Sequence, residues 1–227
     1  MSGLRFASSL RPSRRRLPSK YQTRTPDMRR TLRSALAMGG EPIVRKFLQK
    51  DRRPRRLVLL IDVSGSMEPY ARALIRFAHA TVVGRTRVEA FAIGTRLTRI
   101  TRELSSRDPD AALRAASQAV NDWSGGTRLG ATLREFNDLW GLRGMARGAI
   151  VVFLSDGWDR GEPEMLGEQM QRLHRVSHRQ VWVNPLKHTP GYAPLARGIA
   201  AALPHTDDFI EGHSFESLER LAEAVSA

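Results

Sequence analysis

One stretch limits the fold more than any other: the five apolar residues 57–61 run directly into an acidic, hydroxyl-rich turn that contains Asp62, Ser64, Gly65 and Ser66. An uninterrupted apolar run of this length predicts a strand that is buried on both faces, as strands are inside a parallel sheet. Open α/β sheets bind ligands just beyond the carboxyl ends of such strands. The sequence therefore predicts a ligand site where this strand ends.

Two later segments carry the groups with which this turn can form a metal site. Residues 124–127 read Ser-Gly-Gly-Thr and end at Thr127. A second fully apolar run, residues 149–154, is followed by Ser155 and Asp156. Hydroxyl and carboxylate oxygens are the ligands that small hard cations prefer. We expect the three segments to meet in space.

The three segments together resemble the metal-ion-dependent adhesion site (MIDAS) of von Willebrand factor A (VWA) domains. The matching parts are a DxSxS motif, a Thr in a Gly-rich loop and an Asp after a later apolar strand. The DxSxS motif alone is only moderately specific, whereas the three parts in this order make a strong match. The resemblance covers residues 57–227. It implies that the ion is held by Asp62, Ser64, Ser66, Thr127 and Asp156.

Within the VWA family, the sequences LLIDVSGSM and FLSDGWD and the Arg-rich segment before them resemble the CoxE-like branch. That branch is associated with MoxR-type AAA+ ATPases and with the maturation of molybdenum hydroxylases such as carbon monoxide dehydrogenase. The resemblance therefore implies an adaptor whose partners are such an ATPase and a client metalloenzyme.

The chemistry of these residues can be argued without the family name. Mg²⁺ takes six oxygen ligands in an octahedron and gives up its waters reluctantly. If the three hydroxyls bind directly and the two carboxylates hold bound waters, little negative charge neutralises the ion, and one position stays open for a carboxylate of another protein. We expect Mg²⁺, with Mn²⁺ as an alternative. Three hydroxyls and two carboxylates supply few ligands for Ca²⁺, which takes six to eight oxygens. Such a site can bind a partner without catalysing a reaction.

Four residues beside the three loops are candidates for the rim of the site. Aromatic and Arg side chains are enriched at binding hot spots, which favours Trp158 and Arg128, and Met67 follows the first turn directly. Asp159 lies three residues after Asp156, from where it can reach the rim or, alternatively, cap the next turn. Packing of Trp158 against its own loop is the competing interpretation.

Strands alternate with helices along the rest of the chain, which predicts a Rossmann-like, doubly wound and mostly parallel sheet with helices on both faces. One further strand, over residues 96–101, alternates apolar and polar residues and is expected as a polar edge strand. Strands are predicted over residues 57–61, 88–93, 149–154, 180–183 and 208–211, and helices over residues 69–83, 108–120, 129–140, 162–176, 193–203 and 214–225.

Basic residues are concentrated at the start of the chain. The net charge is +14, and residues 1–56 hold 17 Lys and Arg against 3 Asp and Glu, whereas the remaining 171 residues hold 20 of each sign. We therefore divide the chain into a basic, partly disordered arm (residues 1–56), with a short helix near residues 27–38, and a VWA domain (residues 57–227).

The basic arm supports a second hypothesis: a nucleic-acid-associated protein that binds through its arginines. Against it, no aromatic residues that could stack on bases interleave with the arginines, so nucleic acid is the less favoured partner. A solvated linker is the third interpretation of the arm.

The composition limits the kinds of site and the cellular compartment that we expect for this protein. The chain has no Cys, which excludes disulfides and thiolate metal sites. No apolar run approaches the roughly 18 residues that a membrane helix needs. The arginine-rich start lacks the apolar core of a secretory signal, so a cytoplasmic protein is expected.

Enzymatic interpretations of the same residues fit less well. A phosphatase-type nucleophile at Asp62 needs a second acid two residues later, where Ser64 stands. A serine nucleophile lacks the Gly-x-Ser-x-Gly turn, and no phosphate-binding Gly-x4-Gly-Lys loop is present. His174 and His178 have i, i+4 spacing, but the helix is expected to end between them. We therefore expect a non-enzymatic binding protein.

Overall fold

The computed structural model describes residues 9–40, 44–120, 126–188, 193–194 and 196–212, together with Ser217, Arg220, Leu221 and Val225. The described chain divides into two compact units. Residues 10–54 form the smaller unit, and Ser9 with the residues from Arg55 onward form the larger one.

A six-stranded sheet forms the centre of the larger unit. Its strands, in spatial order, are β6 (Leu97–Arg99), β5 (Val88–Ile93), β4 (Leu57–Asp62), β7 (Ile150–Leu154), β8 (Arg179–Asn184) and β9 (Asp208–Glu211). All neighbouring strands are parallel except β5 and β6, which are antiparallel. The mostly parallel sheet with one edge strand of opposite direction confirms the predicted fold class.

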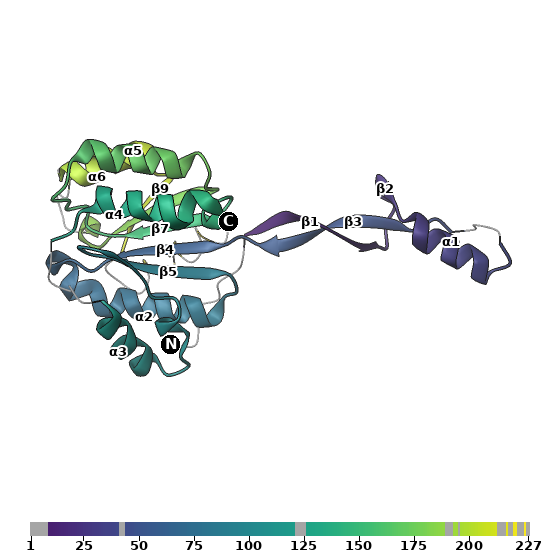
Figure 1. Ribbon diagram of the computed structural model, residues 1–227, viewed down its shortest axis with the longest axis horizontal. Helices are drawn as coiled ribbons and strands as arrows, with labels where there is room; N and C mark the ends of the chain where they lie inside the picture. The colour runs from purple at the N-terminus through teal and green to yellow at the C-terminus, as the bar shows by residue number, and fades with distance from the viewer. Residues whose placement is uncertain are drawn as a thin grey trace. The chain divides into compact units, whose positions relative to one another are not determined.

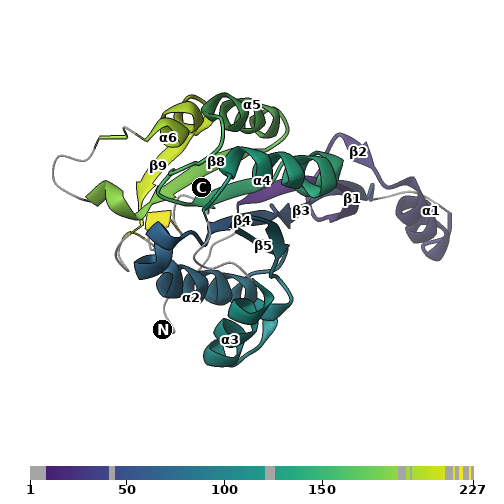
Figure 2. The ribbon, with the colours of Figure 1, turned by 60° about the vertical axis from the view of Figure 1, so that its left-hand side comes forward.

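Helices cover both faces of this sheet (Figure 1). Figure 2 shows α2 and α3 on one face and α4, α5 and α6 on the other. These helices are α2 (Glu68–Gly84), α3 (Pro109–Ala119), α4 (Leu129–Phe136), α5 (Pro163–His174) and α6 (Arg197–Ala202). Short 3-10 turns span Gly65–Met67, Glu103–Ser105, Pro185–His188 and Leu203–His205.

Alternation along β4 divides the core into two layers. Leu57, Leu59 and Ile61 pack in the layer under α2 and α3, and Val58 and Leu60 pack in the layer under α4, α5 and α6. Every residue of β4 is buried, because successive side chains of a central strand point to opposite covered faces. The five-residue apolar run predicted this environment.

Two predicted helices differ from the observed ones. The helix expected over residues 129–140 is α-helical only to Phe136 and continues as a π-type helix over Asn137–Met145, where Gly144 has a φ of 133°. The helix expected over residues 193–203 begins only at Arg197. The closing helix expected over residues 214–225 falls mostly outside the described residues.

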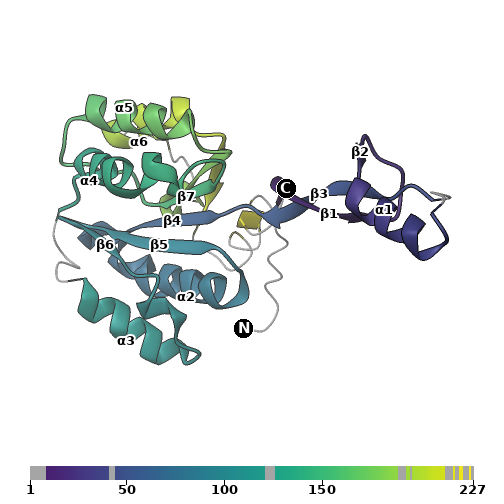
Figure 3. The same cartoon turned by 45° about the vertical axis from the view of Figure 1, so that its right-hand side comes forward.

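The smaller unit contains two long strands and a helix (Figure 3). Strand β1 (Leu10–Ser19) pairs antiparallel with β3 (Phe47–Pro54), and the short β2 (Thr25–Pro26) pairs with the other edge of β3. Helix α1 (Met28–Ala37) lies within the range expected for the short helix, and Arg30 donates its backbone N–H to the Asp27 cap over 3.1 Å. The strand pairing had no counterpart among the sequence predictions.

The two ends of the smaller unit meet at one backbone contact of the larger unit. Arg55 donates its backbone N–H to the carbonyl oxygen of Ser9 over 2.8 Å. Residues 10–54 therefore leave and re-enter the larger unit at neighbouring positions.

Among the described residues, no helix combines the length and the apolar character needed to cross a membrane.

Candidate metal centre

The candidate site lies at the topological switch point of the sheet. From β4 the chain passes outward to β5 and β6, and it then returns to β7 on the other side of β4. Asp62 is the last residue of β4, and Ser155 and Asp156 follow β7 directly, with Ile61 and Leu154 paired in register. Parallel strands end at the same edge of a sheet, and the crevice at a switch point is where such sheets bind ligands.

The Asp62 carboxylate connects the three predicted segments. Its Oδ1 atom accepts hydrogen bonds from the Ser64 backbone N–H over 2.9 Å and from the Thr127 hydroxyl over 3.0 Å. Its Oδ2 atom accepts the Ser155 hydroxyl over 2.6 Å. The first turn, the Gly-rich loop and the segment after β7 are thus brought together on one side chain.

Asp62 has no exposed surface, and its electrostatic environment is unfavourable for an anion. The pKa of Asp62 is raised to about 6, chiefly because the carboxyl group is buried; hydrogen bonds from Ser155 and Ser64 oppose this rise, and the charge of Asp156 adds to it. The charge of Asp156 therefore disfavours ionisation of Asp62 across the switch point. A positive charge placed beside them would offset the cost of burying the carboxylate.

The two serines of the first turn lie together at the edge of the site. The Ser64 and Ser66 hydroxyl oxygens are 3.1 Å apart, and Ser64 is buried whereas Ser66 is exposed. Ser64 has an extended backbone immediately before the 3-10 turn Gly65–Met67, and Ser66 lies within that turn. The two hydroxyl oxygens therefore lie side by side, that of Ser64 on the buried side of the site and that of Ser66 on the exposed side.

Asp156 offers an oxygen that no other group uses. Its Oδ1 atom accepts the Trp158 backbone N–H over 2.9 Å, whereas its Oδ2 atom is buried and has no hydrogen-bond partner in the described structure. The carbonyl oxygen of Asp156 accepts the Asn184 side-chain amide over 3.0 Å, which fixes the backbone here. A buried carboxylate oxygen without a partner is costly unless a ligand satisfies it.

Thr127 is held in place from the other side of the site. Its carbonyl oxygen accepts the Arg160 backbone N–H over 3.0 Å, and its side chain is 2% exposed. Of the loop predicted to carry it, Gly126 is described, whereas Ser124 and Gly125 lie outside the described residues.

These oxygen donors fit hard cations such as Mg²⁺ or Mn²⁺ better than softer metals that prefer nitrogen or sulfur ligands. Within the described residues, no three or more His, Cys, Asp or Glu gather closely enough to hold a metal ion. Any cation here would therefore depend on the Ser64, Ser66 and Thr127 hydroxyls beside two carboxylates. The unpartnered Oδ2 atom of Asp156 and the hydroxyl pair are consistent with that chemistry.

A family profile described as "VWA domain containing CoxE-like protein" matches residues 4–218. The chain belongs to this CoxE-like VWA family. VWA domains generally act as interaction modules, and the family assignment agrees with the one predicted from the sequence.

Solved structures show the same fold in distant proteins. A von Willebrand factor type A protein from Catenulispora acidiphila matches with a TM-score of 0.54 and 18% identity, over 79% of this chain and 43% of that one. Proximal thread matrix protein 1 from the mussel byssus matches with a TM-score of 0.52 and 13% identity, over 76% and 47% of the two chains. The CoxE-like chain thus spans less than half of the length of either structure. A comparison with proteins of curated function returns no match.

Two of the four predicted rim residues have structural roles in the CoxE-like domain. Met67 is fully buried in the core under α2, so its assignment to the rim was wrong: the 3-10 turn directs its side chain inward. Asp159 uses its carboxylate for backbone N–H groups, accepting from Leu129 at 2.9 Å, Gly130 at 3.2 Å and Gly161 at 2.8 Å. It thus caps the start of α4.

The other two rim candidates are exposed. Trp158 is 67% exposed, and Arg128 is exposed immediately before α4. Their role at the rim stays a prediction. The histidine pair does not form, because α5 ends at His174, whose Nε2 atom lies 3.3 Å from Asp207 Oδ1.

Sequence reasoning missed Ser155. Ser155 follows the second apolar run but is not among the predicted metal ligands, although its hydroxyl makes the shortest of the three contacts to Asp62, at 2.6 Å. The available signal was its position, since it is the first polar residue after a fully apolar strand beside β4.

Replacing Asp159 with Ala tests whether this carboxylate caps α4 or binds the ion. Loss of its three N–H contacts should lower the free energy of unfolding by about 1–2 kcal/mol, equally with Mg²⁺ and with EDTA. Urea unfolding followed by circular dichroism measures this change.

The control for this variant is Glu168→Ala, which removes an exposed carboxylate within α5 and should change stability by no more than about 0.5 kcal/mol. If Asp159→Ala left the metal-free protein unchanged and removed only the stabilisation by Mg²⁺, Asp159 would be a metal ligand instead of a cap.

Proposed function

We propose that this protein is a non-enzymatic interaction module that binds a divalent cation and uses it to hold an acidic residue of a partner protein. The observation that carries the proposal is the convergence of three segments on the buried Asp62, beside the unpartnered Oδ2 atom of Asp156. In this proposal the metal set is Asp62, Ser64, Ser66, Thr127 and Asp156.

Mg²⁺ is the first candidate for the ion, with Mn²⁺ as the alternative. All the donors are oxygen, and only two of them can be anionic, so a bound divalent cation keeps part of its charge. A cation whose charge is only partly neutralised attracts a further carboxylate. A partner can supply that carboxylate at the exposed side of the site, where Ser66 reaches solvent.

A hydrolytic function has less support from the same residues. The Ser64 and Ser66 hydroxyls contact each other, and the Ser155 hydroxyl donates to Asp62. Of the described histidines, His79 and His188 contact the carbonyl oxygens of Ser106 and Pro185. An activated serine needs a base within hydrogen-bond reach. These contacts place no histidine beside Ser64, Ser66 or Ser155, and the Asp62 carboxylate that accepts from Ser155 belongs to the proposed metal set.

Membership of the CoxE-like family supports a proposal about the partner. We propose that the module binds a MoxR-type AAA+ ATPase and assists maturation of a client metalloenzyme, such as a molybdenum hydroxylase of the carbon monoxide dehydrogenase type. In this role it is a chaperone-like adaptor, and we place its work in the cytoplasm, where an ATP-driven partner operates. This assignment rests on family membership, whereas the metal bridge rests on the site.

Thr127→Val tests the metal site, because valine keeps the shape of the side chain and removes the hydroxyl. The affinity for Mg²⁺ should fall at least about tenfold, since the variant loses a proposed ligand and the hydroxyl that donates to Asp62. Isothermal titration calorimetry measures the affinity, and the rise in melting temperature with Mg²⁺ concentration provides a second readout.

Thr98→Val, on edge strand β6, is the matched control and should leave the affinity unchanged. Because Thr127 is buried, its variant can also lose intrinsic stability, so the exposed Ser66→Ala serves as a second variant with the same expected loss of affinity. Wild-type affinity in both variants would contradict the proposed ligand set.

The metal bridge to a partner is tested at constant Mg²⁺ and nucleotide, because the ATPase needs Mg²⁺ for its own nucleotide and EDTA would disable both proteins. A MoxR-type AAA+ ATPase of the same organism should bind Ser66→Ala and Thr127→Val at least about tenfold more weakly than the wild type and Thr98→Val. Biolayer interferometry measures the affinities. Equal binding by all four proteins would refute the bridge.

A second candidate function is binding of nucleic acid by the smaller unit. Residues 10–54 contain 14 Lys and Arg against 3 Asp and Glu, in a unit with paired strands. Such a charge density attracts any polyanion, with affinity that depends steeply on salt.

Replacing Arg14, Arg15 and Arg16 together with Ser tests this second function. If the unit binds a DNA duplex, the slope of log affinity against log salt should fall by about 2–3, while Thr127→Val has no effect. Fluorescence anisotropy of a labelled duplex measures the slope. The control replaces the exposed Arg102, Arg107 and Arg143 of the larger unit; a duplex that binds all three proteins alike would exclude the basic unit as its site.

A further inference from the structure

A hollow of about 470 Å³ opens directly beside the candidate metal centre. Its walls are mostly apolar and are formed by Trp158, Leu186, Ala193 and Ala196. Hollows of this size with apolar walls and a few polar groups are typical of ligand sites. No residue of the proposed metal set other than Asp156 lines it.

Asp156 belongs to both the hollow and the metal centre. One of its carboxylate oxygens is fixed by the Trp158 backbone N–H, and the other has no hydrogen-bond partner in the described structure. A ligand group bound at the metal centre therefore has the hollow as its immediate neighbour. A partner segment that extends toward this side of Asp156 passes over the apolar walls.

The loop that carries Trp158 packs closely against α6, although the indole is 67% exposed. Gly157 has a φ of 82°, and a Cβ atom there would lie 2.5 Å from Ile199 Cβ; a Cβ atom on Gly198 would lie 2.5 Å from the Gly157 carbonyl oxygen. The loop and the start of α6 therefore pack in direct backbone contact. A wall fixed in this way binds at a lower entropic cost, and an exposed Trp on a fixed loop is a typical binding hot spot.

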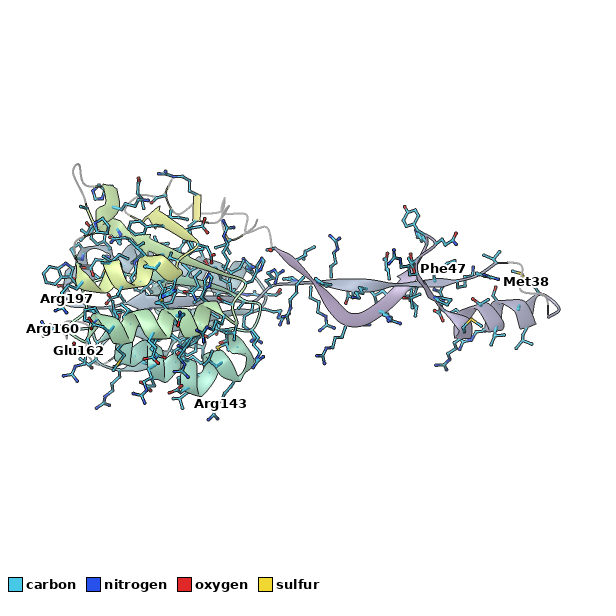
Figure 4. All side chains as sticks on the ribbon, turned by 90° about the horizontal axis from the view of Figure 1, so that it is seen from above. Met38, Phe47, Arg143, Arg160, Glu162 and Arg197 are labelled. Atoms are coloured by element: carbon cyan, nitrogen blue, oxygen red, sulfur yellow. The ribbon has the colours of Figure 1, made fainter. Side chains whose placement is uncertain are left out.

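Cationic side chains flank this region of the larger unit. Arg197 lines the hollow, and Figure 4 shows Arg160 and Arg197 at the same end of the unit, near Glu162. Asp159, which also lines the hollow, accepts hydrogen bonds from three backbone N–H groups through its carboxylate. The hollow is thus lined by Asp156 and Asp159 as well as Arg197, so selection there depends on its apolar walls, and the negative charge of the partner segment is directed to the metal centre.

We propose that this hollow is a second subsite, which takes a bulky apolar side chain located one or two residues from the partner's metal-binding carboxylate. The recognised unit is then an acidic residue beside an aromatic or leucine-like residue on an extended segment, and the hollow selects among acidic segments. This inference rests on the proposed function, since the carboxylate positions the segment.

Short capped peptides with one Glu provide the probe. One set carries Phe one or two residues from the Glu, on either side, and the matched set carries Ser at the same positions. In Mg²⁺, at least one Phe peptide should bind about tenfold or more tightly than its Ser counterpart, because the hollow removes the ring from water. Amide NMR titrations measure the affinities, and the Trp158 indole signal should shift with the Phe peptides.

Two variants test whether the hollow is the source of the tighter binding of Phe peptides. Trp158→Ala removes one wall and Ala193→Trp occupies the hollow, and both residues are exposed, so folding is preserved. Each variant should bind Phe and Ser peptides equally while keeping the wild-type affinity for Mg²⁺. Leu139→Ala, which changes another exposed apolar residue, is the control and should keep the preference.

The outcomes separate this inference from the proposed function. Equal, Mg²⁺-dependent binding of Phe and Ser peptides would overturn the subsite and leave the metal bridge standing. Mg²⁺ binding without binding of either peptide would also overturn the subsite. A protein that does not bind Mg²⁺ at all would refute the proposed function itself.

Discussion

Three stretches of chain depend on one buried carboxylate. Asp62 ends the central strand with no exposure to solvent, and it accepts hydrogen bonds from Ser64, Thr127 and Ser155. Removing one carboxylate would leave three donors without an acceptor in a dry environment, which is costly for folding. The same bonds bring the hydroxyl groups within reach of one another, so the stability of the loops and the assembly of the candidate metal centre have a common origin.

The parts that follow from local patterns could be predicted from the sequence. Unbroken apolar runs identified β4 and β7 as central strands, because only strands covered on both faces tolerate them. The alternating pattern near residue 97 identified β6 as the edge strand. The convergence of Asp62 and Thr127 was predicted through the family motif, and the hydrogen bond between their side chains agrees with it.

The parts that depend on packing in three dimensions could not be predicted. Met67 follows the motif directly but points into the core, and Asp159 follows Asp156 closely but caps a helix that starts thirty residues earlier. The pairing of β1 with β3 joins arginine-rich segments with few apolar residues, where backbone hydrogen bonds provide regular structure without any hydrophobic pattern in the sequence. The hollow beside Asp156 needs walls from three separate segments.

The 2.8 Å contact between the Ser9 carbonyl and the Arg55 amide has a consequence for how this protein can be divided. Because the chain departs and returns at adjacent backbone positions, residues 10–54 form an insertion between Ser9 and Arg55 of the larger unit. A short glycine bridge from Ser9 to Arg55 would close the gap without altering the register of β4.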